Sequence, residues 1–411
     1  MLLSQADEGA LAGDAGPAVA MAMDLVVAAG RAMGAERLLD ISAAHVDSCL
    51  YHGEASLDFA SRLADLGARV VVPTTLNVSS LDLLHPGLFR GDQQLADGAR
   101  SLMDAYVSMG CSPTWTCAPF QLAERPRLGD QIAWGESNAI VFANSVLGAR
   151  TNRYGDFIDI CCAITGRAPA AGLHLDEGRR ASLQVDVAVD DELLDDDLTY
   201  VALGHVLGEE AGTEVAVITG LDHRADEDRL KAMGAAAASS GAVGMFHVAG
   251  VTPEAETVSA ATGGVTPRRM VSVDVGRLRS AVGELSSGTT RLGAVSIGTP
   301  HASTGEIAAL ARLVEGRRTT VPFYVNTGRN VLEEVAPEHL ETIEEFGVTV
   351  VTDTCTYITP IMGEPDGAVM TNSGKWAYYA PGNLGVDVVL AGLADCVESA
   401  ATGEVRVRGL G

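Results

Sequence analysis

The sequence predicts a compact multi-domain α/β protein. Its 411 residues are too many for one core of ordinary size, so two or three domains are expected. Hydrophobic residues make up 47% of the chain and aromatic residues 5%, and there are 46 glycines, a profile typical of α/β enzymes rich in Ala, Val and Gly. Short apolar runs also alternate with segments of helical apolar spacing, as strands and helices do in such enzymes.

The first region alternates helices and strands. Helices are expected from their apolar spacing at 15–33, 56–66 and 93–110, and strands from short apolar runs at 37–41, 69–72 and 112–117. Two polar segments, 42–47 and 73–77, directly follow predicted strands. An α/β sheet places its ligands at such positions, so we expect both segments to be functional loops.

Two further series of strands and helices follow. The second has strands at 215–219 and 243–247 around an Ala-rich helix at 230–239, and the third has strands at 291–297, 320–325 and 348–352 with helices at 305–315 and 330–346. An acidic run between residues 186 and 200 is interpreted as a solvated loop or helix start near a domain junction. We therefore predict domains over 1–198, 199–290 and 291–411.

The charge balance excludes several classes of function. There are 54 acidic and 28 basic residues, a net charge of −26, which repels phosphate backbones and anionic membranes. No stretch is apolar enough for a membrane span, and the first residues lack the basic and apolar regions of a secretory signal. Seven cysteines without such a signal indicate a reducing cytoplasm. We expect a cytoplasmic protein that binds neither nucleic acid nor membrane.

Four cysteines lie in segments that could carry chemistry. Cys117 follows a predicted turn, Cys161 and Cys162 are adjacent, and Cys355 comes directly after an apolar strand. They do not form the paired spacing of a zinc ribbon. Isolated thiols at strand ends suit an iron–sulfur cluster with one open iron position. The alternative is that they are buried thiols that pack as small hydrophobic groups.

Several segments resemble the large subunit of the aconitase X family. The resemblance runs nearly end to end and in the same order. It rests on Ser42-Ala43-Ala44-His45-Val46-Asp47, Pro73-Thr74-Thr75-Leu76-Asn77, Gly135-Glu136-Ser137-Asn138-Ala139, the segments 142–153 and 160–167, Gly298-Thr299-Pro300-His301, Asp353-Thr354-Cys355 and Thr371-Asn372-Ser373-Gly374-Lys375.

The resemblance implies a hydro-lyase with a multi-domain, aconitase-like body. That body consists of three domains, described as three-layer α/β domains, and lacks the swivelling small domain. That small domain is then expected as a separate subunit, which supplies the serine base of aconitase-type chemistry. The substrate is a small molecule, either cis-3-hydroxy-L-proline or mevalonate 5-phosphate. The archaeal, phosphomevalonate type has cysteine where this chain has Thr299, whereas the bacterial type has cysteine in the segment that matches 160–167. The sequence therefore favours hydroxyproline.

The same resemblance implies a set of site residues. The cluster, either 2Fe–2S or 4Fe–4S, would be held by Cys117, Cys355 and one of the neighbouring pair, with Cys161 favoured over Cys162. Amide, hydroxyl and carboxyl groups suited to a small zwitterion are offered by Thr74, Thr75, Asn77, Glu136, Ser137, Asn138, Asn144 and Ser145.

Catalytic roles are assigned to His45, Asp47 and Lys375. His45 and Asp47 could transfer protons or orient the substrate, and the Lys375 ammonium could hold a carboxylate. The alternatives are a hydrogen-bonded loop histidine and an exposed surface lysine. Two other functions stay open, a phosphomevalonate dehydratase and a cluster-free scaffold or binding protein.

Overall fold

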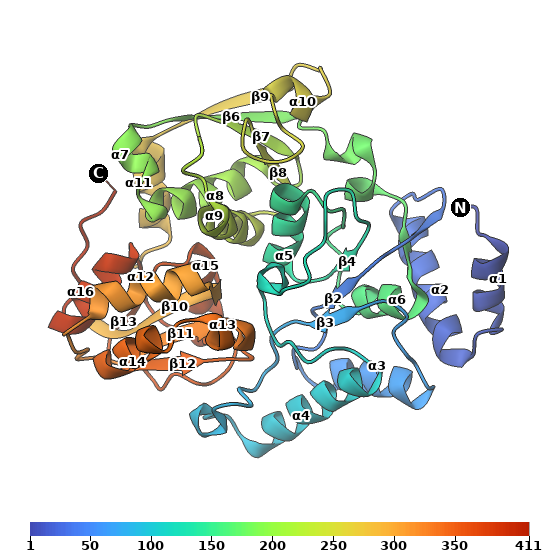
Figure 1. Cartoon of the computed structure of the whole chain (residues 1–411), viewed down its shortest axis with the longest axis horizontal. Helices are drawn as coiled ribbons and strands as arrows, with labels where there is room; N and C mark the ends of the chain where they lie inside the picture. The colour runs from blue at the N-terminus through green and yellow to red at the C-terminus, as the bar shows by residue number, and fades with distance from the viewer. Residues whose placement is uncertain (411) are drawn as a thin grey trace. The chain divides into compact units, whose positions relative to one another are not determined.

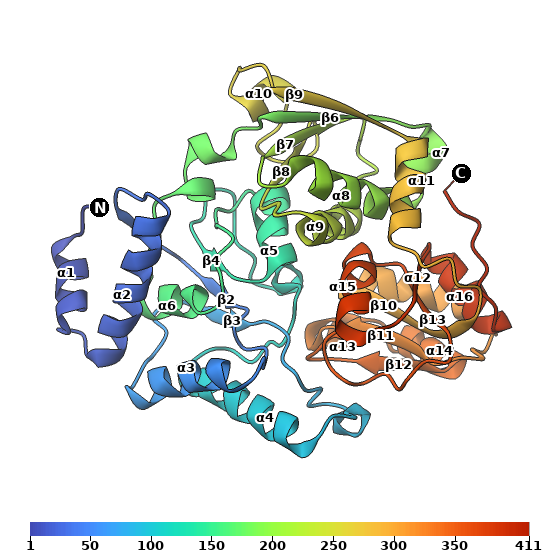
Figure 2. The same cartoon turned by 180° about the vertical axis from the view of Figure 1, so that it is seen from behind.

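The computed structural model describes residues 1–410, which form two compact units (Figures 1 and 2). Unit 1 comprises Met1–Leu81 and Gly91–Arg180, and unit 2 comprises Asp82–Arg90 and the chain from Ala181 onward. No helix among the described residues is long and apolar enough to span a bilayer.

Unit 1 is built around a small parallel sheet. Its strands are β2 (Ala44–Val46), flanked by β3 (Thr74–Leu76) and β4 (Ala133–Trp134), and β1 (Leu38–Asp40) pairs antiparallel with β5 (Arg167–Pro169). The helices are α1 (Gln5–Ala12), α2 (Pro17–Ala32), α3 (Glu54–Asp65), α4 (Gln93–Ser108), α5 (Ser137–Phe142), α6 (Ile158–Thr165), the π-helix Ala143–Leu147 and 3₁₀ turns at Pro119–Gln121, Gly172–His174 and Asp176–Arg179. Figure 1 shows α2 beside α6 and α3 beside α4, and these pairs are in contact.

Two of the strands predicted for unit 1 are wrong. Residues 69–72 form no strand, because Val71 is 63% exposed and the N–H groups of Val70 and Val71 donate to the carbonyls of Met109 and Ala163. Residues 112–117 form only an isolated bridge between Ser112 and Thr75. The segments expected to be loops, 42–47 and 73–77, instead contain the strands β2 and β3. The candidate residues therefore lie in the sheet as well as at its ends.

Unit 2 contains a four-stranded parallel sheet in the order β8-β7-β6-β9. Its elements are β6 (Leu183–Ala188), α7 (Asp191–Leu194), α8 (Asp197–Ala211), β7 (Ala216–Thr219), α9 (Glu227–Ser240), β8 (Phe246–Val248), α10 (Val258–Thr262), β9 (Arg269–Asp274) and α11 (Val275–Glu284). Helices α8 and α9 pack closely because Gly204 of α8 lies against the backbone of α9. A Cβ on Gly204 would lie 2.2 Å from the Met233 carbonyl oxygen.

A five-stranded parallel sheet forms the rest of unit 2, in the order β12-β11-β10-β13-β14. Its elements are β10 (Leu292–Ala302), α12 (Thr304–Val314), β11 (Phe323–Thr327), α13 (Arg329–Glu334), α14 (Pro337–Phe346), β12 (Val348–Val351), β13 (Ala368–Thr371), α15 (Gly374–Leu384), β14 (Val388–Leu390) and α16 (Leu393–Thr402); the 3₁₀ turn Pro86–Leu88 also belongs to unit 2. The apolar core runs along this sheet through residues such as Val295, Phe323 and Met370.

One helix predicted over 330–346 is two helices, α13 and α14. Pro337 begins α14, and Ala336 before it is extended at φ −60°, ψ 130°, because a residue that precedes proline is disfavoured in the helical region. Apart from this break, the strands and helices predicted for unit 2 are found within a few residues of their expected places. The predicted α/β class with parallel sheets is confirmed.

Candidate functional site

Unit 1 buries a carboxylate at the carboxyl end of its central strand β2. One oxygen of Asp159, on α6, accepts hydrogen bonds from the backbone N–H groups of Asp47 (2.7 Å) and Ser48 (3.3 Å), and the other accepts the Ser48 hydroxyl at 3.1 Å. The Tyr106 hydroxyl in turn donates to the Ser48 hydroxyl at 2.7 Å. Asp159 thus fixes the first residues after β2, and with them the direction of Asp47.

Both carboxyl groups have raised pKa values. Burial raises the pKa of Asp159 to about 6, against the lowering effect of its backbone hydrogen bonds. Burial also raises the pKa of Asp47 well above its ordinary value, and the neighbouring Glu136, Asp156 and Asp159 raise it further. The Asn77 amide donates to Asp47. Burial and the neighbouring carboxylates therefore raise the pKa of the Asp47 carboxyl and favour its protonated form.

His45, in β2 itself, is fully buried and uncharged. Burial lowers its pKa to about 4, because the imidazolium is disfavoured away from water. Its Nδ1 lies 2.8 Å from the Thr75 hydroxyl. Interactions with Glu136, the Asn77 side chain and the Thr116 backbone raise the pKa of His45, but the effect of burial is larger.

The segment 135–138 supports both this cluster and Cys117. The Gly135 N–H donates to the His45 carbonyl at 2.8 Å, and a Cβ at Gly135 would lie 2.6 Å from Oδ2 of Asp159. The carboxylate of Glu136 accepts the Ala139 N–H at 3.0 Å and so caps α5. The Asn138 amide donates to the Cys117 carbonyl at 2.7 Å. Asn138 therefore positions the backbone of a candidate cluster ligand.

Several residues predicted to bind substrate make hydrogen bonds within the protein. Both amide atoms of Asn144 are used internally, because Nδ2 donates to the Thr151 carbonyl and Oδ1 accepts from Arg179. The Thr74 hydroxyl donates to the Val72 carbonyl at 2.9 Å, and that of Ser137 to Glu136 at 3.2 Å. Ser145 is buried in the π-helix that follows α5. Among the predicted residues, Asn77 contacts Asp47, Thr75 contacts His45, and Glu136 acts electrostatically on both Asp47 and His45.

All seven cysteines are buried and unbridged. In unit 1 Cys117 is 2% exposed, and it follows Trp115, whose φ of +46° turns the chain sharply. Cys161 and Cys162 are adjacent on α6 and fully buried. Burial raises the pKa of both thiols, so a bound cation would have to offset that cost before either became a thiolate ligand.

In unit 2 Cys355 is held by a densely bonded loop. The backbone of Asp353 has a φ of +61°. Its carboxylate accepts two hydrogen bonds of 2.6 Å from Arg329 and one from the Leu83 N–H. Asp82 likewise accepts the N–H and hydroxyl of Thr352, each at 2.9 Å. The ring nitrogen of buried His301 and the Cys355 sulfur lie within 4.8 Å of each other. The loop thus places a thiol and an imidazole together.

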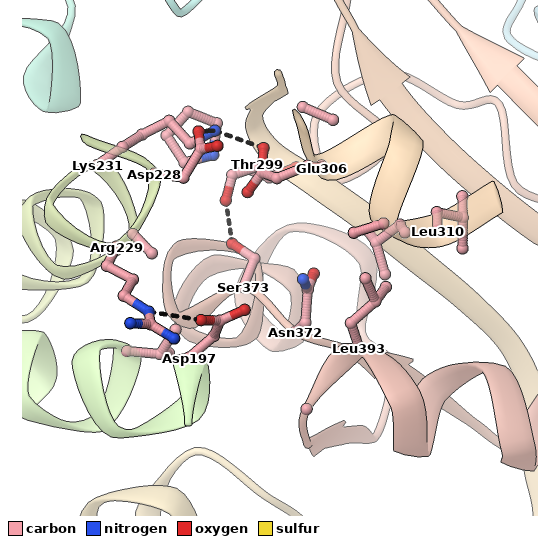
Figure 3. A pocket seen from close by; sticks show the side chains of 18 of the residues that line it. Asp197, Asp228, Arg229, Lys231, Thr299, Glu306, Leu310, Asn372, Ser373 and Leu393 are labelled. Carbon is pink, nitrogen blue, oxygen red and sulfur yellow. Dashed lines mark hydrogen bonds and ion pairs between the residues drawn. The ribbon is translucent and has the colours of Figure 1, made fainter. Parts of the chain in front are cut away.

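Unit 2 also has a cavity of about 190 Å³ at the carboxyl ends of β10 and β13 (Figure 3). Lys231 lines it and is held by Asp228 at 2.8 Å and Glu306 at 2.5 Å. Burial lowers the pKa of Lys231, but the two carboxylates outweigh burial and the net shift is upward. The Ser373 hydroxyl, which caps α15, donates to the Thr299 carbonyl. This cavity was not predicted.

Lys375 is 4% exposed, so it is not the surface lysine of the alternative interpretation. The sequence contains only two lysines, and both are buried. Asp159, Lys231 and Glu306 were missed. The scarcity of lysine was a signal for Lys231, but nothing in the residues around Asp159 distinguishes it from a surface acid at a helix start.

The chain matches the Aconitase X first domain over residues 1–177, the second domain over 181–283 and the third domain over 292–402. It is 48% identical over 97% of its length to a cis-3-hydroxy-L-proline dehydratase of Pseudomonas aeruginosa, of which it covers 69%. It is 37% identical over 94% of its length to a phosphomevalonate dehydratase large subunit of Methanothermobacter thermautotrophicus, of which it covers 96%. It also superposes on the holo-form of Thermococcus kodakaraensis aconitase X with a TM-score of 0.87 and 32% identity, covering 97% of this chain and all of that one.

Gly135→Ala is expected to destabilise unit 1 by about 1–3 kcal/mol, because the added Cβ would crowd the Asp159 carboxylate and the Asp47 Cβ. The matched control is Gly155→Ala, since nothing lies within 4 Å of a Cβ at that position. Urea-induced unfolding of both variants measures the difference. Equal transition midpoints would show that the close approach at Gly135 is not a constraint.

Proposed function

Because this chain belongs to the aconitase X family, whose named relatives are dehydratases, we propose that it is the large subunit of an iron–sulfur hydro-lyase that converts cis-3-hydroxy-L-proline to Δ1-pyrroline-2-carboxylate. The observation that carries this choice is the 48% identity to the hydroxyproline dehydratase over 97% of the chain. A second relative of that name, from Hypocrea jecorina, is 40% identical over 98% of the chain.

Dehydration of mevalonate 5-phosphate is the second candidate. It is favoured by the 37% identity to a phosphomevalonate dehydratase large subunit. A phosphate needs unpaired cations, and two arginines of unit 1 are already engaged by carboxylates. Arg150 pairs with Asp176 at 2.6 Å, and Arg167 binds Asp7 and Asp40. Because these two guanidinium groups are already paired, they support cis-3-hydroxy-L-proline as the substrate over mevalonate 5-phosphate.

The proposed cofactor is an iron–sulfur cluster, either 2Fe–2S or 4Fe–4S, held by Cys117, Cys355 and one of Cys161 or Cys162. The donor set suits it, because all of these thiols are buried and unbridged, and the loops of Cys117 and Cys355 are anchored by side-chain hydrogen bonds. An open iron would act as a Lewis acid toward the substrate carboxylate and hydroxyl.

The residues of the chain would orient the substrate and supply a proton. Elimination removes a Cα proton and expels hydroxide from the adjacent carbon. Asp47, whose raised pKa favours the protonated form, is suited to protonate the leaving oxygen, and His45, whose pKa burial lowers to about 4, is suited to orient the substrate as a neutral imidazole. Lys375 is proposed to hold the substrate carboxylate. The base that removes the Cα proton would come from a small subunit.

A separate small subunit is supported by the archaeal relatives named large subunits, such as the one of which this chain covers 96%. Its swivelling domain stays a prediction. A reducing, cytoplasmic location is likewise proposed, because seven buried thiols remain unbridged.

The substrate is tested by co-expressing the chain with a small-subunit gene and assaying both candidates for loss of water. We expect turnover of cis-3-hydroxy-L-proline and none of mevalonate 5-phosphate. Turnover of the phosphorylated substrate alone would replace the first proposal with the second.

Cys117→Ser and Cys355→Ser are expected to abolish both the iron content and turnover while the far-UV circular dichroism spectrum is unchanged. Cys161→Ser and Cys162→Ser, measured in parallel, identify the third ligand as the variant that loses iron. Cys396→Ser is the control, because this buried thiol only donates to the Ala391 carbonyl, and it should keep its iron. Wild-type protein purified anaerobically without colour or iron would instead favour the cluster-free scaffold.

Asp47→Asn removes the acidic proton but keeps the shape of the side chain. If Asp47 protonates the leaving group, kcat should fall by about 10²-fold or more with the iron content unchanged. Asp58→Asn, at an exposed position on α3, should leave kcat unaltered. A kcat within about threefold of wild type would remove Asp47 from the mechanism.

A further inference from the structure

A histidine and two glutamates meet where two helices of unit 2 are in contact. His205 and Glu209 are four residues apart on α8 and so lie on one face of that helix, and Glu284 is the last residue of α11. Figure 2 shows α11 beside α8, and the two helices contact each other. A ring nitrogen of His205 and one oxygen of each carboxylate lie within 4.8 Å of one another. Imidazole and carboxylate groups are common ligands of metal ions in proteins.

The spacing of these three groups suits a metal ion better than it suits hydrogen bonds. Nε2 of His205 lies 3.3 Å from Oε2 of Glu284 and 3.8 Å from Oε1 of Glu209. A single N–H points at only one of these oxygens, and the longer distance is outside the range of a hydrogen bond. By contrast, ligand atoms about 2.1 Å from a tetrahedral zinc ion are about 3.4 Å from each other. One ion between the three groups would therefore bind all of them.

Each carboxylate is held through the oxygen that points away from the histidine. Oε1 of Glu284 accepts the Arg277 guanidinium at 3.1 Å and the Ser280 hydroxyl at 2.9 Å, and Oε2 of Glu209 accepts the same guanidinium. Outer contacts of this kind orient metal ligands in proteins. His205 is only 6% exposed, whereas the side chains of Glu209 and Glu284 are 42% and 41% exposed. Packing thus fixes the imidazole, and an ion can still enter from solvent.

The electrostatic surroundings favour a cation. Glu209 and Glu284 lie in the last turns of their helices, where the helix dipole disfavours acidic side chains and favours positive charge. Neither of these two helices, both fully described, has a basic residue in its last turn. The three side chains also line a hollow of about 520 Å³, whose described lining adds a third carboxylate, Asp387, and contains no lysine or arginine. With one charge offset by Arg277, a divalent cation would balance these carboxylates.

We propose that His205, Glu209 and Glu284 bind a divalent ion with the coordination chemistry of zinc, with water completing the coordination. One imidazole and two carboxylates suit zinc, whereas magnesium and calcium prefer oxygen ligands alone. The ion would tie α8 to the end of α11, from which the chain continues into β10 of the second sheet of unit 2. It would therefore stabilise the fold, whichever substrate the enzyme dehydrates.

Zinc binding to the purified full chain tests this site. The chain is treated with a chelator and dialysed against zinc chloride, and the zinc per chain is measured by inductively coupled plasma mass spectrometry. Wild type should hold one zinc more than Glu209→Gln/Glu284→Gln, which keeps the shape of both side chains but removes their charges. Zinc on the cluster thiols would be common to both proteins and cancels in this difference. His205→Gln should lose the same zinc.

Two control variants separate the site from general binding to acidic or histidine side chains. Glu210→Gln changes the next residue of α8, whose carboxylate pairs with Arg269 at 2.6 Å. His223→Gln changes a histidine whose side chain is 91% exposed. Both controls should keep the zinc content of wild type, because neither residue belongs to the cluster.

Zinc should also raise the thermal unfolding midpoint of wild type more than that of Glu209→Gln/Glu284→Gln, because an ion that binds only the folded chain stabilises it. Magnesium at the same concentration should not replace zinc. The far-UV circular dichroism spectrum of the double variant should match that of wild type, since both substituted side chains face solvent. Equal zinc contents in wild type and the double variant, or equal stabilisation by magnesium, would overturn the inference and leave the cluster as an ion pair between a histidine and two glutamates.

Discussion

Buried carboxylates that accept backbone N–H groups hold the functional segments of this protein in place. Asp159 binds the first two residues after β2, and Asp82 binds Thr352 after β12. A buried carboxylate is costly unless its oxygens are satisfied, so each becomes a rigid anchor for the chain that satisfies it. Asp47 in unit 1 and Cys355 in unit 2 lie in the segments that these carboxylates hold. Both residues are proposed to take part in the reaction, Asp47 as a proton donor and Cys355 as a cluster ligand.

A buried cation of the chain is held by carboxylates in a similar way. Both lysines of the chain are buried, and Lys231 is bound by two carboxylates from different helices, α9 and α12. Asp228 also accepts the hydroxyl of Ser303, which is the N-cap of α12. These contacts therefore hold the N-terminus of α12 in place beside the cavity. In this protein, whose net charge is −26, both lysine ammonium groups therefore lie in the interior.

Elimination from a small hydroxy amino acid requires a proton donor near the leaving oxygen. Unit 1 contains a carboxyl, Asp47, whose pKa burial raises and an imidazole, His45, whose pKa burial lowers to about 4. Unit 2 contains an acidic cavity beside a helix N-terminus. These environments differ because Asp47 is surrounded by carboxylates, whereas the carboxylates of the cavity have cations beside them. Membership of a dehydratase family and the local electrostatics therefore point to the same class of reaction.

The sequence by itself determined the α/β class, several of the helices, the family and its hydro-lyase activity, because apolar periodicity and short motifs are local properties of the chain. Helices such as α2 and α4 lie close to the predicted 15–33 and 93–110. Tertiary structure decided the strands of unit 1: the apolar run at 69–72 stays outside the sheet, and the polar segments 42–47 and 73–77 supply β2 and β3. It also decided that the Asn144 amide hydrogen-bonds within the protein, that Lys375 is buried, and that Asp159 and Lys231 bind partners far away in the sequence. Each of those outcomes depends on partners far away in the sequence, such as the 112 residues between Asp47 and Asp159, which no local pattern encodes.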